Sequence, residues 1–145
     1  RSVDDRNALR GGLKTGVIDA VCSDHQPHGL DAKLTPFSES AIGISGLETL
    51  LSLTIQLVKE NTLSLNEAIR AITYGPSQIL NIAAGTLDIG SEADICIFDL
   101  DSERTLNIRD LVSQGKNTPF AERKLFGDVI FTLVEGQVVY KKLIT

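Results

Sequence analysis

The spacing of apolar residues predicts a helix and then a buried strand in the first part of the chain. Ser2 followed by Asp5 has the spacing of an N-terminal capping box, and apolar residues one turn apart follow before Gly16, so we expect this helix to end near Thr15. Residues 17–22 are almost continuously apolar and rich in β-branched side chains. This pattern is typical of a strand that is buried on both faces, as in a parallel sheet.

A long polar segment separates this strand from two predicted helices. Residues 28–46 are interrupted by glycines and by Pro36, which predicts a long loop of the kind that carries active-site residues. Apolar residues return at helical spacing over residues 47–58, and Ser64 with Glu67 forms a second capping box. The helix that follows this box is expected to bury four apolar side chains, those of Leu65, Ala68, Ile69 and Ile72.

The last part of the chain has the pattern of short strands. Pro76 suits the first turn of a short helix that reaches Leu80. Residues 93–100 and 128–140 are strand-like, and Gly136 divides the second run at a predicted hairpin turn. The chain is therefore expected to finish as a β-rich region.

This order of elements predicts an α/β fold in two parts. A helix, a buried strand, a long loop and further helices match the C-terminal end of a TIM (β/α)8 barrel, and the strands match a small β domain. We place the boundary near Ala84, with residues 1–84 as the end of the barrel and residues 85–145 as the small domain. A complete barrel needs roughly 250 residues. Because the chain also begins at Arg1 and has no methionine, we expect it to be part of a longer protein.

Composition and charge narrow the classes of function. A net charge of -5 without any cluster of Lys and Arg argues against nucleic acid, while a small anionic substrate stays open. No apolar run approaches the ~18 residues that cross a bilayer, and no leader pattern opens the chain, so we expect no membrane association and a cytoplasmic location. Cys22 and Cys96 lie in apolar runs without CxxC spacing, which predicts two buried, reduced thiols.

Asp24, His25 and His28 form the one cluster with an evident chemical purpose, directly after the predicted buried strand. The Asp24 carboxylate could bind a divalent metal and accept a proton, or it could cap the loop through backbone N–H groups. His28 could be a metal ligand, a substrate contact or a solvated loop residue, and His25 could simply hold the loop. Catalytic zinc usually takes about three protein ligands, so further ligands are expected elsewhere.

Three segments of the chain form a specific combination: Ser23-Asp24-His25-Gln26-Pro27-His28, Gly43-Ile44-Ser45-Gly46-Leu47-Glu48-Thr49 and Gly115-Lys116-Asn117-Thr118-Pro119-Phe120. Together they resemble the dihydroorotases of the amidohydrolase superfamily, and the similarity extends over essentially the whole chain. A histidine at position 28 favours dihydroorotases over allantoinases and hydantoinases, which share the Asp-His-x-Pro element.

The resemblance implies a role for each matching residue. Asp24 would be a zinc ligand and the general acid or base that moves a proton to the ring nitrogen. His28 would contact dihydroorotate, and the backbone at Ile42 and Gly43 would help to hold its ring. The resemblance also implies one or two zinc ions, most of whose ligands lie outside this chain, and a β-sandwich that residues 85–145 form only in part.

The function implied for the complete protein is that of a hydrolase in pyrimidine biosynthesis. It would be a zinc-dependent dihydroorotase that reversibly hydrolyses the cyclic amide of dihydroorotate to N-carbamoyl-aspartate on the route to UMP, while the chain alone would bind zinc weakly and have no turnover. The protein partners that the resemblance suggests are a second copy of the same protein, in a homodimer, and aspartate transcarbamoylase. Asn117 and Phe120 are interpreted as a turn and a core anchor that pack the β domain onto the barrel.

Two departures from the family pattern keep alternatives open. Gln26 replaces a small residue, and residues 121–123 replace a glycine-containing turn. A glutamine at position 26 resembles a noncatalytic dihydroorotase-like branch that supports assembly of aspartate transcarbamoylase. Another cyclic amidohydrolase, of the allantoinase or hydantoinase type, is the third interpretation.

Overall fold

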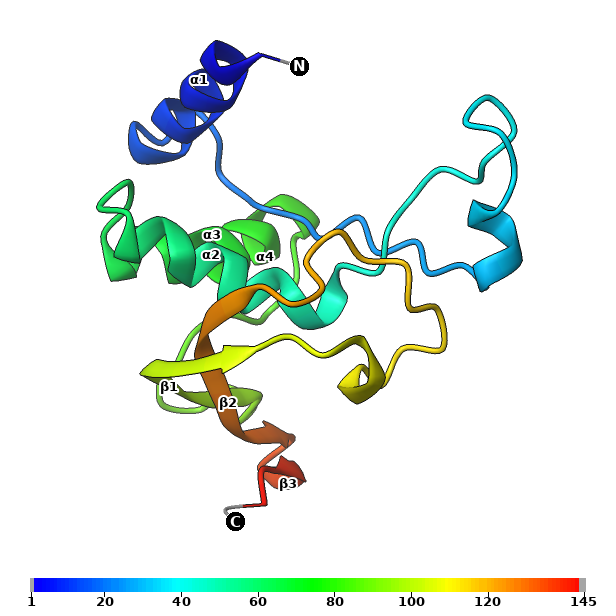
Figure 1. Ribbon diagram of the computed structural model, residues 1–145. Coiled ribbons are helices and arrows are strands. Elements are labelled where there is room, and N and C mark those ends of the chain that lie inside the picture. Colours follow the sequence, from blue (N-terminus) through cyan, green and yellow to red (C-terminus); the bar gives the residue numbers. More distant parts are fainter. Residues whose placement is uncertain (1, 144–145) are drawn as a thin grey trace.

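The computed structural model describes residues 2–143, which form a mixed α/β structure around a long irregular loop (Figure 1). The α-helices in these residues are α1 (Val3–Lys14), α2 (Leu50–Lys59), α3 (Leu65–Ile72) and α4 (Tyr74–Leu80), and the strands are β1 (Ile95–Thr105), β2 (Lys124–Val134) and β3 (Gln137–Lys141). Short 3-10 helices are η1 (Leu30–Lys33), η2 (Leu47–Thr49) and η3 (Ile108–Asp110). The predicted order of a helix, a long loop, further helices and then strands is confirmed, but the strand predicted at residues 17–22 is absent from the described residues.

Helix α1 begins and ends where its sequence predicts. The main-chain N–H of Asp5 donates to Ser2 Oγ (3.1 Å), and the main-chain N–H of Ser2 donates to the Asp5 carboxylate (2.8 Å), which completes the capping box. Thr15 is the C-terminal cap, and Gly16 follows with a φ of 72°, a left-handed conformation that suits glycine.

Helices α2 and α3 pack together and provide part of the core. Ile55 of α2 is fully buried, as is Ala68 of α3. The predicted apolar face of α3 is confirmed only in part, because Ile69 and Ile72 are half-buried and Leu65 is exposed. Ala71, which was not expected to be buried, packs inside instead.

The second capping box gives a testable contribution to stability. Ser64→Ala is expected to lower the free energy of unfolding by about 1 kcal/mol, because Ser64 Oγ accepts from the N–H of Glu67. The main-chain N–H of Ser64 also donates to the Glu67 carboxylate, which holds the pKa of Glu67 below its ordinary value of 4.5. The stability contributed by the ionised Glu67 carboxylate is present at neutral pH and is lost as the pH falls through the lowered pKa of the folded state.

Urea unfolding of Ser64→Ala at neutral pH measures the contribution of the hydroxyl, and unfolding of Glu67→Gln at neutral pH and below pH 4.5 measures that of the carboxylate, because alanine keeps the main-chain N–H. Ser38→Ala is the matched control, since Ser38 is an exposed loop residue. Equal stability of Ser64→Ala and Ser38→Ala at neutral pH would contradict the assigned role of the cap.

The strands form one antiparallel sheet with β2 in the centre (Figure 1). The predicted hairpin turn is confirmed at Glu135 and Gly136, whose φ values are 50° and 77°. Helix α2 packs on β2, and Gly127 of β2 allows this approach, because a Cβ there would lie 3.1 Å from the Ile55 side chain. Beside the sheet lies a small apolar cluster made of Leu106, Leu111 and Leu125, with Leu53 and Phe120 against it.

Residues 17–22 are not a strand in this structure, which corrects the sequence-based expectation. Val17 is 79% exposed, and the extended segment pairs with no strand among the described residues. Its backbone hydrogen bonds go to helices instead: the N–H groups of Val17 and Ile18 donate to the carbonyl of Gly12, and that of Val21 donates to the carbonyl of Ala71. A parallel strand needs a neighbour on each side to satisfy its N–H and C=O groups, and residues 2–143 supply none at this segment.

The two cysteines are free, as expected, but they are exposed rather than buried. Cys22 is exposed because its segment lacks neighbouring strands. Apolar neighbours desolvate the Cys96 thiol enough to raise its pKa above the usual value.

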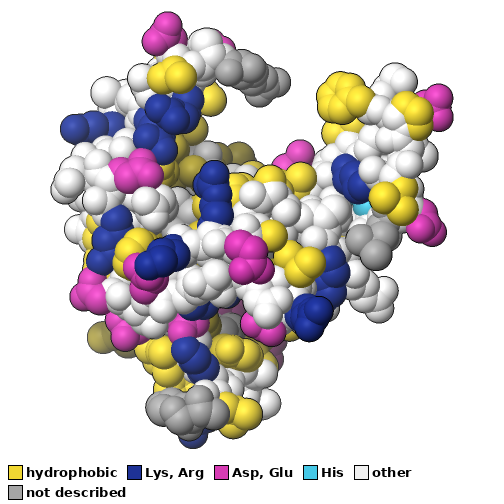
Figure 2. All heavy atoms as spheres, viewed as in Figure 1, with side chains coloured by type: hydrophobic (Ala, Val, Ile, Leu, Met, Phe, Trp, Pro, Cys, Tyr) yellow, Lys and Arg dark blue, Asp and Glu magenta, His cyan; other side chains and the backbone are white. Residues whose placement is uncertain are grey.

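The surface is mixed in charge, and Lys and Arg side chains alternate with Asp and Glu on the face shown in Figure 2. The loop before α2 stands out from the body in Figures 1 and 2, and its Phe37 is fully exposed. No helix within residues 2–143 has the length and apolar character needed to cross a membrane. The barrel, the sandwich and the boundary at residue 84 stay predictions, since the described residues contain a single sheet of three strands.

Candidate functional site

Asp24 lies on the surface at the end of the extended segment, in a backbone conformation that few residues adopt. Its φ is 43°, in the left-handed region, and the residue is exposed. Gln26 Nε2 donates to Asp24 Oδ1 (3.0 Å), so the side chain two residues later restrains the carboxylate. Among the described residues, the partner of the carboxylate is this side chain and not a backbone N–H. Asp24 remains a candidate for binding and proton transfer.

His25 holds the loop to the start of the following helix. The main-chain N–H groups of Gly46 and Leu47 both donate to His25 Nδ1, each at 3.1 Å. Nδ1 is therefore unprotonated, because a ring nitrogen that carries a hydrogen cannot accept. A parallel bridge between His25 and Ile44 adds to the connection. This matches the interpretation of His25 as a residue that holds the loop.

The structure brings His28, Ile42 and Gly43 together. His28 Nε2 lies 2.8 Å from the carbonyl oxygen of Ile42. Since a carbonyl oxygen only accepts, Nε2 carries the hydrogen and donates. Gly43 has a φ of 115°, and a Cβ at this position would lie 2.3 Å from Gln26 Cβ. Gly43 therefore meets both a conformational and a steric requirement for glycine.

Gln26 links Asp24 to this group. Its side chain binds the Asp24 carboxylate, its Cβ lies against Gly43, and its N–H donates to the carbonyl of Ile44 (2.9 Å). The four candidate residues from the sequence, Asp24, His28, Ile42 and Gly43, are therefore connected through one glutamine and one histidine contact. Among the described residues, Asp24 is hydrogen-bonded to Gln26 and to none of the other three.

Two polar residues that the sequence did not point to also hold this group. Lys33 Nζ donates to the carbonyl of Gly43 at 2.9 Å and also to that of Ala41. Asn117 Nδ2 donates to the same Gly43 carbonyl at 3.1 Å. Asn117 belongs to a motif that the sequence analysis interprets as a turn. No motif in the sequence marks Lys33, which is simply a cation inside a polar loop. Phe120 does pack on the core, as expected.

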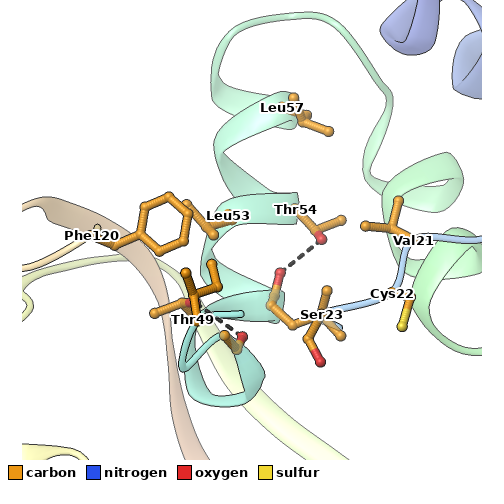
Figure 3. Close-up of a pocket in the computed structure, with 11 residues that line it drawn as sticks. Val21, Cys22, Ser23, Thr49, Leu53, Thr54, Leu57 and Phe120 are labelled. Carbon is orange, nitrogen blue, oxygen red and sulfur yellow. Dashed lines mark hydrogen bonds between the residues drawn. The ribbon is translucent and has the colours of Figure 1, made fainter. Parts of the chain in front are cut away.

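An apolar cavity of about 290 Å³ lies behind the segment that leads to Asp24 (Figure 3). Val21 and Cys22 form one side, and Leu53 of α2 faces Phe120 on the other. The hydroxyl of Thr54 donates to the carbonyl of Leu50 within the helix, so it offers little to a polar ligand. None of the four candidate residues lines this cavity, which separates it from the group around Gly43.

The described residues do not make a complete metal centre. Within residues 2–143, no three His, Cys, Asp or Glu side chains lie close enough together to hold a metal ion. Asp24 is the exposed carboxylate of the group, His25 Nδ1 already accepts two backbone donors, and His28 Nε2 donates to Ile42. The group can supply one metal ligand and several hydrogen-bonding groups, but not the full set that zinc takes.

Known proteins similar to this chain point to one family. Curated dihydroorotases from Syntrophus aciditrophicus and Syntrophotalea carbinolica are 44% and 42% identical to it, over 98% and 97% of the chain. Among solved structures, dihydropyrimidinase from Brevibacillus agri has a TM-score of 0.91 with 25% identity over 97% of the chain and 32% of its own length. L-hydantoinase from Arthrobacter aurescens has a TM-score of 0.90 with 30% identity over 98% of the chain and 33% of its own length.

The chain spans about a third of the length of these relatives, 33% for each of the two dihydroorotases. The sequence model described as "Amidohydrolase family" matches residues 1–139. The match covers the Asp24 segment, the loop around Gly43 and most of the sheet. The chain belongs to the amidohydrolase family.

Proposed function

We propose that the complete protein containing residues 1–145 is a cytoplasmic dihydroorotase of pyrimidine biosynthesis. It would hydrolyse the cyclic amide of dihydroorotate to N-carbamoyl-aspartate, and catalyse the reverse reaction. The observation that carries the proposal is the contact between His28 and Ile42 beside Gly43, with Asp24 connected through Gln26. The dihydroorotases that share 38–44% identity with the chain support this choice of substrate.

The groups of the site have complementary tasks in this proposal. The Asp24 carboxylate, exposed at the end of its segment, would accept a proton and pass it to the ring nitrogen that leaves when the amide opens. The N–H of Gly43 donates to no group among the described residues and would hold an oxygen of the substrate ring. His28 would lie against the substrate carboxylate while its Nε2 keeps the Ile42 peptide in place.

The resemblance to dihydroorotases implies that the complete protein requires zinc. A bound divalent ion supplies a hydroxide nucleophile at neutral pH in enzymes of this chemistry. Among residues 2–143, Asp24 would be the single protein ligand, and catalytic zinc takes about three. The remaining ligands would come from outside this chain.

The substrate assignment predicts a clear order of activities. Purified complete protein is expected to open dihydroorotate with a larger kcat/KM than hydantoin, dihydrouracil or allantoin. Ring opening and closure can be followed by the ultraviolet absorbance of the amide and by chromatography of N-carbamoyl-aspartate. Faster opening of hydantoin or allantoin would replace the dihydroorotase assignment with another cyclic amidohydrolase.

One observation favours a second candidate, a noncatalytic subunit that supports assembly of aspartate transcarbamoylase. The bond from Gln26 to the Asp24 carboxylate occupies an oxygen that the reaction would need. In that case the complete protein would open no cyclic amide but would form a complex with aspartate transcarbamoylase on size-exclusion chromatography. Turnover of dihydroorotate by the unchanged protein would exclude this candidate.

A further inference from the structure

We propose that Asn117 is a positioning residue for the substrate-binding loop, an inference that rests on the proposed function. Two arms of the loop, residues 26–28 and residues 41–45, meet at the candidate site. Asn117 lies between these arms, although it is 89 residues from His28 and 74 from Gly43 along the chain. Its one carboxamide group binds both arms.

The contacts use both halves of the carboxamide. The main-chain N–H of His28 donates to Asn117 Oδ1 (2.9 Å), and Asn117 Nδ2 donates to the carbonyl of Gly43 (3.1 Å). The main-chain carbonyl of Asn117 also accepts from the N–H of Ser45 (2.9 Å). A side chain that both accepts and donates is needed for this arrangement.

The segment that carries Asn117 is fitted tightly against the loop. A Cβ on Gly115 would lie 2.6 Å from both the main-chain nitrogen of His28 and Pro27 Cβ, so only glycine allows the approach. Ser45 is 5% exposed, and its hydroxyl donates to the carbonyl of Gly115. Residues 115–117 are therefore a built part of the site rather than an ordinary surface turn.

These contacts fix the peptide groups on both sides of Gly43. His28 Nε2 holds the carbonyl of Ile42, and Asn117 with Lys33 holds the carbonyl of Gly43. In a trans peptide the N–H points opposite to the carbonyl, and no cis peptide occurs among the described residues. The Gly43 N–H must then point away from the His28 ring, and it donates to no group among the described residues.

An isosteric substitution separates this role from simple packing. In Asn117→Asp, the side chain keeps its shape and its acceptor for the His28 N–H, but it turns an oxygen toward the Gly43 carbonyl. Two acceptors cannot share a hydrogen bond, so the Gly43 peptide loses one donor and meets a repulsive neighbour. The orientation of the peptide group between Gly43 and Ile44 should then become less well defined, and with it the backbone of Gly43 that would hold the substrate ring.

The test measures steady-state kinetics of the complete protein with dihydroorotate. Asn117→Asp is expected to raise KM about tenfold and to change kcat much less, because binding geometry rather than chemistry is disturbed. Asn107→Asp is the matched control, since Asn107 uses only its Oδ1, which accepts from the N–H of Arg109. A KM for Asn117→Asp equal to that of the control would overturn the proposal. A tenfold loss in kcat with an unchanged KM would overturn it as well.

A second variant and a second measurement make the result independent of activity. Lys33→Met removes the other donor to Gly43, and its effect on KM should be nonadditive with Asn117→Asp because the two donors share one acceptor. Hydrogen exchange should become faster in Asn117→Asp at the N–H groups of Gln26 and Ser45, which are hydrogen-bonded to Ile44 and Asn117, and stay unchanged in Asn107→Asp. If the protein without substitutions does not open dihydroorotate, the proposed function fails. Hydrogen exchange then decides by itself whether Asn117 holds the loop, and equal exchange rates with and without Asn117→Asp would overturn that role.

Discussion

Asp24→Asn is expected to lower kcat for dihydroorotate about 10²–10⁴-fold in the complete protein, the range found when a general acid or base is removed. Asparagine has nearly the same shape and still offers an oxygen to Gln26 Nε2, so the contact with Gln26 can persist. What it loses is the negative charge and the ability to take up a proton. The fold should therefore be unchanged while turnover collapses.

Asp88→Asn is the matched control for this experiment. Asp88 is an exposed aspartate in the segment before β1, far along the chain from the site, and its substitution is expected to leave kcat unchanged. Circular dichroism and thermal unfolding of both variants would show that the comparison is between folded proteins. Full activity of Asp24→Asn would remove Asp24 from the mechanism.

The second large effect is expected at Gly75, at the start of α4, where the chain has no room for a side chain. A Cβ at Gly75 would lie 2.1 Å from the carbonyl oxygen of Asp19 and 3.0 Å from that of Arg70. Both are backbone atoms, so relief requires α4 or the segment that leads to Asp24 to move. Gly75→Ala is therefore expected to lower the free energy of unfolding by about 1–3 kcal/mol.

Gly11→Ala is the same substitution but is expected to have the opposite effect on the free energy of unfolding. Gly11 lies inside α1, and a Cβ there would meet nothing within 4 Å. Alanine should raise the free energy of unfolding by about 0.5–1 kcal/mol, because it restricts the unfolded chain and favours the helix. Urea unfolding of both variants tests the pair, and a stabilising effect of Gly75→Ala would show that the contact with Asp19 is absent.

Local signals in the sequence predicted the helices and the hairpin well. Ser2 and Ser64 each begin a helix with a capping box whose contacts lie within three residues, so the sequence itself contains both partners. Gly136 marks the hairpin for the same reason, since its positive φ is a property of the turn. Such features depend little on the rest of the fold.

The missed features depend on partners that are distant along the chain. The apolar run at residues 17–22 predicts a strand, but pairing needs neighbouring strands that residues 2–143 do not contain at that place. Asn117 contacts His28 and Gly43 across 89 and 74 residues, and an Asn-Thr-Pro sequence reads equally well as a turn. Lys33 had no periodicity or motif that could have singled it out.

The candidate site was predictable because its residues stand close together in a recognisable order. The Asp-His-x-Pro-His segment and the glycine-containing loop are both short motifs, and the structure places His28 beside Ile42, while their roles toward a substrate stay predictions. The sequence did not reveal that Gln26 would bridge the Asp24 carboxylate and the Gly43 backbone. The residues on either side of that contact, Asp24 and Gly43, both have positive φ values, which the sequence signals only at the glycine.

The left-handed backbone at Asp24 also restricts which amino acids can occupy this position before any chemistry is considered. Aspartate, asparagine and glycine tolerate such a conformation, whereas valine, isoleucine and threonine meet a steric penalty from their branched Cβ. Position 24 is therefore expected to tolerate substitution only by glycine or by short polar residues. Glutamate, which would preserve the charge, would have to adopt a conformation that aspartate accepts far more readily.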